Sequence, residues 1–223
     1  MILLIDKEKG ITSFDVIRKL KPKFPKKTKI GHAGTLDPLA SGLMIVAIER
    51  EDTKRLTEFL KLPKRYLVEV KFGSTSATYD SEGPFTVVVP EGDLLQSPLP
   101  VAVIETAISE NFIGEISQRP PDFSAAHVNG VRAYALARRG EKVDLPSRRI
   151  TIHSCEIVSY EWPKLVLDVR CSSGTYIRSL AHDLGQVLGC GAYVQELRRT
   201  EIGEYRIEDA QKIEDVNFSE NPA

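Results

Sequence analysis

Residues 150–189, ITIHSCEIVSYEWPKLVLDVRCSSGTYIRSLAHDLGQVLG, contain the pattern that decides the fold class. Two apolar runs, 150–160 and 164–171, flank a short turn and predict the two strands of a β-hairpin. Apolar residues at helical spacing over 177–188 then predict an amphipathic helix, which Gly189 ends. An antiparallel strand pair followed directly by a helix is typical of an α+β fold.

The remainder of the chain mixes strands and helices without the regular alternation of βαβ units. Further strands are predicted at 2–5, 43–48 and 66–72. Further helices are predicted at 13–20 and 52–60, capped by Ser13 and Asp52, and at 101–112 and 129–139. We therefore expect one α+β domain, residues 1–223, with a central, largely antiparallel mixed sheet flanked by helices.

The composition is that of a globular protein, with 42% hydrophobic and 27% charged residues. The first six residues lack the basic region of a signal peptide, and no apolar run is long enough to span a membrane. The three cysteines form no CxxC pair, so we expect a reducing cytoplasmic location. The four histidines show no ligand spacing, which disfavours a metal site.

The net charge of −1 conceals an uneven distribution of basic residues. Residues 18–29, RKLKPKFPKKTK, carry seven cations and no acid. Further arginines form pairs at 138–139, 148–149 and 198–199. Separated basic stretches on a neutral chain suit a face that binds phosphates, although solvated surface charge explains them equally well.

Residues 31–42, GHAGTLDPLASG, form the densest candidate site, which we interpret as a loop. The segment is not a P-loop, because no Gly-Lys-Ser/Thr follows it. Pro38 favours an extended Asp37, whose carboxylate could then project as a nucleophile or a base. An ordinary Asp-Pro turn is the alternative interpretation.

Two other segments could contribute to a site. Arg178 falls in the first turn of the predicted helix, where the helix dipole disfavours a cation. An anionic partner would explain that position, and Asp37 or a phosphate are candidates. Lys64-Arg65-Tyr66 places an aromatic ring beside two cations, a combination that can stack on a base and hold phosphates.

Five segments together resemble the TruB family of pseudouridine synthases, in the order that the family has them. The resemblance covers nearly the whole chain, and its segments are MILLIDKEKGITSFDVIRKLK (1–21), GHAGTLDPLASGLMIVAIEREDTK (31–54), KRYLVEVKFGSTSATYDSEG (64–83), PPDFSAAHVNGVRAYALARRGE (120–141) and VRCSSGTYIRSLAHDLGQVLGCGAYVQELRRTEIGEY (169–205). The departures are Glu8, His127 and Tyr193, where the family commonly has proline, lysine and histidine.

The resemblance implies a pseudouridine synthase fold with an RNA-binding cleft, and a tRNA pseudouridine synthase that acts on the T-loop uridine at position 55. Asp37 matches the catalytic aspartate, Arg178 its arginine partner, and Tyr66 the tyrosine that stacks on the target base. His32 matches the histidine that helps to displace the target nucleotide, while Tyr176 and Leu197 match residues that line the uracil pocket.

The implied reaction needs no cofactor, because it breaks one bond to the base and forms another without a change of oxidation state. The partner would be a tRNA T-stem-loop bound by a monomer without a C-terminal PUA domain. We expect contacts to the RNA backbone from Lys26, Lys27, Lys29, Lys64 and Arg132. Two other classes of protein stay open: an RNA-binding module that has lost catalysis, and a hydrolase that uses a carboxylate on a small molecule.

Overall fold

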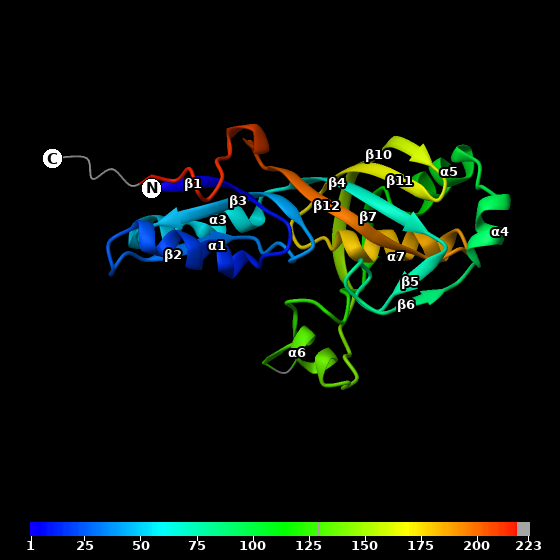
Figure 1. Cartoon of the computed structure of the whole chain (residues 1–223), viewed down its shortest axis with the longest axis horizontal. Helices are drawn as coiled ribbons and strands as arrows, with labels where there is room; N and C mark the ends of the chain where they lie inside the picture. Colours follow the sequence, from blue (N-terminus) through cyan, green and yellow to red (C-terminus); the bar gives the residue numbers. More distant parts are fainter. Residues whose placement is uncertain (129, 218–223) are drawn as a thin grey trace. The chain divides into compact units, whose positions relative to one another are not determined.

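The computed structural model describes residues 1–128 and 130–217 (Figure 1). The chain divides into two compact units: Met1–Tyr66 with Leu197–Ala223, and Leu67–Glu196. Strands β4 (Lys64–Phe72) and β12 (Ala192–Ile202) contribute residues to both units. Among the described helices, none is long and apolar enough to cross a membrane.

The first unit is built around strand β3 (Ser41–Ile48), which is buried along almost its whole length. Strand β1 (Ile2–Lys7) pairs with one edge of β3 and is antiparallel to it. On the other edge lie β2 (Ile30–Ala33), antiparallel, and the second half of β12, parallel. Strand β13 (Tyr205–Arg206) extends this sheet from β12. A strand that is buried on both faces has apolar side chains at nearly every position. The strand β3 could therefore be predicted from its continuous apolar run.

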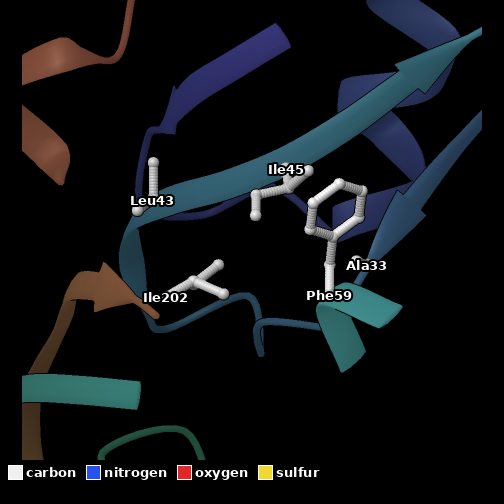
Figure 2. Close-up of a cluster of buried hydrophobic side chains, with 5 residues drawn as sticks. All are labelled: Ala33, Leu43, Ile45, Phe59 and Ile202. Carbon is white, nitrogen blue, oxygen red and sulfur yellow. The ribbon is translucent and has the colours of Figure 1, made fainter. Parts of the chain in front are cut away.

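The core of the first unit lies between this sheet and its short helices. Figure 2 shows the cluster formed by Ala33, Leu43, Ile45, Phe59 and Ile202. Phe59 comes from α3 (Leu56–Lys61), which follows α2 (Arg50–Lys54). The predicted helix 52–60 is therefore two helices, and Asp52 caps neither of them.

Helix α1 (Ser13–Leu20) is confirmed, but its predicted cap is wrong. Thr12 is the N-cap residue, and it forms a capping box with Asp15. Ser13 is buried instead, and its hydroxyl bonds the backbone N–H and carbonyl of Leu36. A 3-10 turn, η1 (Lys21–Lys23), follows α1 and contains Pro22.

The second unit has the strand order β12-β4-β11-β10-β7. The predicted hairpin is confirmed as β10 (Arg148–Glu161) and β11 (Lys164–Cys171), which pair antiparallel. Strand β7 (Gly114–Gln118) pairs with the start of β10. Helix α7 (Ile177–Val187) follows β11 as predicted and buries one face. Mixed strands and helices with mostly antiparallel pairing confirm the α+β assignment.

The remaining elements of the second unit are short. They are β5 (Ser74–Ser76), β6 (Phe85–Val87), α4 (Glu91–Gln96), α5 (Val101–Asn111), β8 (His127–Val128), β9 (Val131–Arg132) and α6 (Ala133–Arg138). The predicted helix 129–139 is wrong in its first part, because residues 131–132 pair with 127–128 as strands. Residue 129 itself lies outside the described residues. The first unit also contains a second 3-10 turn, η2 (Ile207–Asp209).

Candidate active site

The loop that carries Asp37 is held in place from several directions within the first unit. The Ser13 hydroxyl bonds both backbone groups of Leu36, at 2.8 and 2.9 Å. The carbonyl of Pro38 accepts the N–H of Gly10 at 2.8 Å, and the carbonyl of Asp37 accepts the N–H of Ala40 at 3.1 Å. The half-buried Asp37 therefore lies in a segment whose backbone is fixed on both sides of it.

Arg199 fixes the same loop from β12. Only 1% of Arg199 is exposed, and its guanidinium donates to the carbonyls of Leu43 at 2.8 Å and of Gly34 at 3.0 Å. The two strands approach closely because residue 42 is glycine. A Cβ there would lie 2.2 Å from the carbonyl oxygen of Arg199. Arg199 thus holds the loop from the interior of the unit, and it is not part of an exposed cationic surface.

His32 lies on β2, so the interpretation of 31–42 as a loop is wrong for its first residues. Its ring is half-buried, and Nδ1 is buried with no hydrogen-bond partner among the residues that the structure describes. Burial and the nearby Arg199 guanidinium lower the pKa of His32. The imidazole is therefore neutral at pH 7.

The other site residues of the first unit lie on strands. Tyr66 on β4 and Leu197 on β12 are both buried. Lys64 is only 7% exposed, and its ammonium donates to the carbonyls of Leu60 and Leu62, both at 2.6 Å. Lys64 thus caps the end of α3, and we exclude it from the RNA-binding surface.

Arg178 lies in the second unit, in the first turn of α7, and is 4% exposed. It donates to the carbonyls of Thr78 at 2.7 Å and Phe123 at 3.0 Å. Its NH1 lies 3.4 Å from Oδ2 of the equally buried Asp80. Asp80 also accepts hydrogen bonds from the Thr78 hydroxyl and from the N–H of Glu82. A buried carboxylate thus compensates the arginine that the helix dipole disfavours.

Sequence reasoning missed Asp80 as a partner of Arg178. The signal was available in residues 76–83, SATYDSEG, because an aspartate that bonds the N–H two residues later is typical of an Asx turn. Nothing in the sequence marks this turn as buried.

Tyr176 is the N-cap residue of α7. Its backbone N–H and carbonyl bond the side-chain amide of Gln118, at 2.8 and 3.0 Å. The guanidinium of Arg148 lies 5.3 Å from the centre of the Tyr176 ring. One turn along α7, His182 stacks on Tyr79 at 3.8 Å, and burial raises the pKa of the neighbouring Asp183 to about 6.

The remaining basic candidates are on the surface. Lys26, Lys27 and Lys29 are exposed on the segment between α1 and β2. Arg132 is exposed on β9. Arg198, unlike Arg199, is partly exposed and forms a two-pronged ion pair with Asp6. Among residues 1–128 and 130–217, no group of His, Cys, Asp and Glu side chains could hold a metal ion.

Solved structures share this fold. A chain from an H/ACA RNP bound to a substrate RNA containing 2′-deoxyuridine aligns with a TM-score of 0.69 and 27% identity, over 96% of this chain. A Cbf5-Nop10-Gar1 complex gives a TM-score of 0.69 at 28% identity. This chain spans about half the length of those chains, 51% and 52%.

Sequence comparisons extend along the whole chain. Residues 19–177 match the model of the TruB family pseudouridylate synthase N-terminal domain, and residues 178–220 match the tRNA pseudouridylate synthase B C-terminal domain. A tRNA pseudouridine synthase B from Aquifex aeolicus is 45% identical over 99% of this chain and 74% of its own length. One from Parabacteroides distasonis is 42% identical over 97% and 91%. The chain therefore belongs to the TruB family of pseudouridine synthases.

Proposed function

We propose that this protein is a tRNA pseudouridine synthase that isomerises the T-loop uridine at position 55. The observation that carries the proposal is 45% identity to a tRNA pseudouridine synthase B along 99% of the chain. The firmly held loop around Asp37 supports it, because a covalent nucleophile needs a fixed position.

Asp37 is the proposed nucleophile. The reaction breaks the bond between C1′ of the ribose and N1 of uracil and forms a bond between C1′ and C5. The hydrogen on C5 then leaves as a proton and N1 gains one, so the product is an isomer of the substrate. The carboxylate adds either to C6 of the base or to C1′ of the sugar, and both routes end in the same product. No oxidant, reductant or water molecule is consumed.

The remaining residues bind and expose the uridine in this proposal. A stacked base must leave its helix or loop before a side chain can reach it. His32 displaces the nucleotide, Tyr66 stacks on the flipped base, and Tyr176 with Leu197 lines the uracil pocket. By the family match Arg178 is the arginine partner of Asp37, and within its own unit Asp80 holds the guanidinium in position.

Asp37→Asn tests the proposal. We expect loss of isomerisation with tRNA affinity within a few fold of wild type, because the amide keeps the shape of the side chain but is not a nucleophile. Tritium release from tRNA labelled at uridine C5 measures turnover, and filter binding measures affinity. Turnover above one hundredth of wild type would contradict the role of Asp37. A wild-type protein that binds tRNA and releases no tritium would favour an RNA-binding module.

A further inference from the structure

The first unit contains a groove that the proposed chemistry does not use. Its volume is about 640 Å³, and it opens beside β2, between α1 and α2. The lining includes Phe14, Arg18 and Lys21 on the α1 side, Lys29 and Gly31 on the β2 side, and Thr53 of α2. Among the described strands, β2 pairs only with β3.

The groove is separate from the position of His32. His32 is not among the residues that line the groove, although its strand neighbours Ile30 and Gly31 are. An occupant of the groove is therefore a different group from the uridine that His32 is proposed to displace.

The lining combines an exposed aromatic ring with cations. Phe14 is 62% exposed, and the guanidinium of Arg18 lies 5.5 Å from the centre of its ring. Asp15 offsets the charge of Arg18 through an ion pair at 2.6 Å. Lys21 and Lys29 are exposed, and no carboxylate belongs to the lining. An exposed phenylalanine among cations offers a stacking surface beside sites for phosphate.

We propose that this groove binds a nucleotide of the RNA substrate outside the target uridine. The base lies on the Phe14 ring, and Lys21 with Lys29 binds the flanking phosphates. This inference rests on the proposed function, because it takes the RNA to be the substrate. Positive charge, which Lys26 and Lys27 extend along the connecting segment, favours a polyanion over a second copy of the chain. The exposed Phe14 ring, on which a base can stack, favours RNA over an acidic peptide.

Two variants test the groove. We expect Phe14→Ala to weaken tRNA binding at least about fivefold, since stacking of one base contributes roughly 1–3 kcal/mol. We expect Lys21→Gln with Lys29→Gln to weaken binding and to lower its dependence on salt. Filter binding to whole tRNA measures both. The matched control is Lys54→Gln with Lys164→Gln, which removes two exposed lysines that lie beside glutamates.

A second measurement tests the position of the base directly. tRNA that carries 5-iodouridine forms a photochemical cross-link to a stacked aromatic ring, so we expect an adduct on Phe14 by mass spectrometry. Uridine monophosphate in excess should leave this adduct in place, because the phosphates of the intact strand contribute to binding. Loss of the adduct under competition would assign the groove to free nucleotides and overturn its assignment to RNA.

The outcomes separate this inference from the proposed function. Unchanged affinity in both variants, without an adduct on Phe14, would overturn the assignment of the groove as an RNA-binding site. Tritium release by the wild-type protein would leave the synthase assignment intact in that case. Absence of tritium release would overturn the synthase assignment, and weakened binding in the two variants would then still support the groove as an RNA site. Thermal melting of each variant shows that lost affinity does not reflect unfolding.

Discussion

Arg199 is a buried cation that holds the loop carrying Asp37, the proposed nucleophile. Its guanidinium bonds the carbonyls of Leu43 and Gly34, and its charge contributes to the low pKa of His32. Loss of these donors would leave buried carbonyls unsatisfied, at a cost of about 1–3 kcal/mol each. Arg199 is therefore a positioning residue in our interpretation.

Two substitutions separate its charge from its shape. We expect Arg199→Met to raise the pKa of His32, and Arg199→Lys to leave that pKa low because the charge stays. Both variants should lower kcat more than they raise KM, since lysine cannot reproduce the planar fork that holds the loop. NMR titration of His32 and tritium-release kinetics measure these effects. An unchanged His32 pKa in Arg199→Met would remove the electrostatic part of this role.

Asp80 holds Arg178 within the second unit, and the pair is almost fully buried. We expect Asp80→Asn to reduce kcat by at least about tenfold, because a buried guanidinium without its carboxylate shifts toward other acceptors. The control is Asp122→Asn, which removes a carboxylate that pairs with Arg119 in a far more exposed position. Tritium release at saturating tRNA measures kcat. Equal activity in the two variants would show that Asp80 is not needed to position Arg178.

At the scale of the element, two adjacent residues at the start of α1 make different contacts. Thr12 caps the helix, whereas Ser13 bonds the loop at Leu36. We expect Thr12→Ala to reduce the free energy of unfolding by about 1 kcal/mol with kcat unchanged. Ser13→Ala should lower both, because it frees the loop beside Asp37. Urea unfolding and tritium release measure the two quantities. A normal kcat in Ser13→Ala would show that the loop holds its position without this contact.

The elements that the sequence predicts correctly are those with a strong local pattern. The β10–β11 hairpin and α7 have clear periodicity, and Pro22 limits α1. The errors depend on contacts between distant residues. Residue type favours Ser13 over Thr12 as the N-cap. The Ser13 hydroxyl instead bonds Leu36, a contact that the sequence does not reveal. Similarly, the first residues of the predicted loop form strand β2 because they pair with β3.

The same limit applies to the candidate site. Asp37, Tyr66 and Arg178 are identified from the family resemblance, but the partner of Arg178 depends on tertiary structure. Two neighbouring arginines on one strand have opposite environments: Arg198 pairs with Asp6 near the surface, and Arg199 is buried. A count of charges along the sequence cannot distinguish them, because alternation along β12 decides which side chain enters the interior.

At the scale of the whole molecule, a net charge of −1 does not prevent RNA binding if cations are concentrated locally. The segment between α1 and β2 carries Lys26, Lys27 and Lys29, all exposed. The structure gives these lysines no ion pair with a described carboxylate. Local concentration of unpaired cations is the arrangement that attracts a phosphate backbone, so salt dependence is the property that should report it.

We expect tRNA affinity to fall steeply with salt, by roughly 0.7–0.9 log units per log unit of salt for each phosphate contact. Replacement of Lys26, Lys27 and Lys29 by glutamine should lower that slope by about two to three. At saturating tRNA, kcat should change little, because phosphate contacts position the RNA, whereas the proposed chemistry occurs at Asp37. The control replaces three lysines that each lie beside a glutamate: Lys19, Lys54 and Lys164. Values of kcat/KM across a salt series measure both effects. Equal slopes for the two triple variants would mean that total charge governs binding, and that this segment has no special contact with RNA.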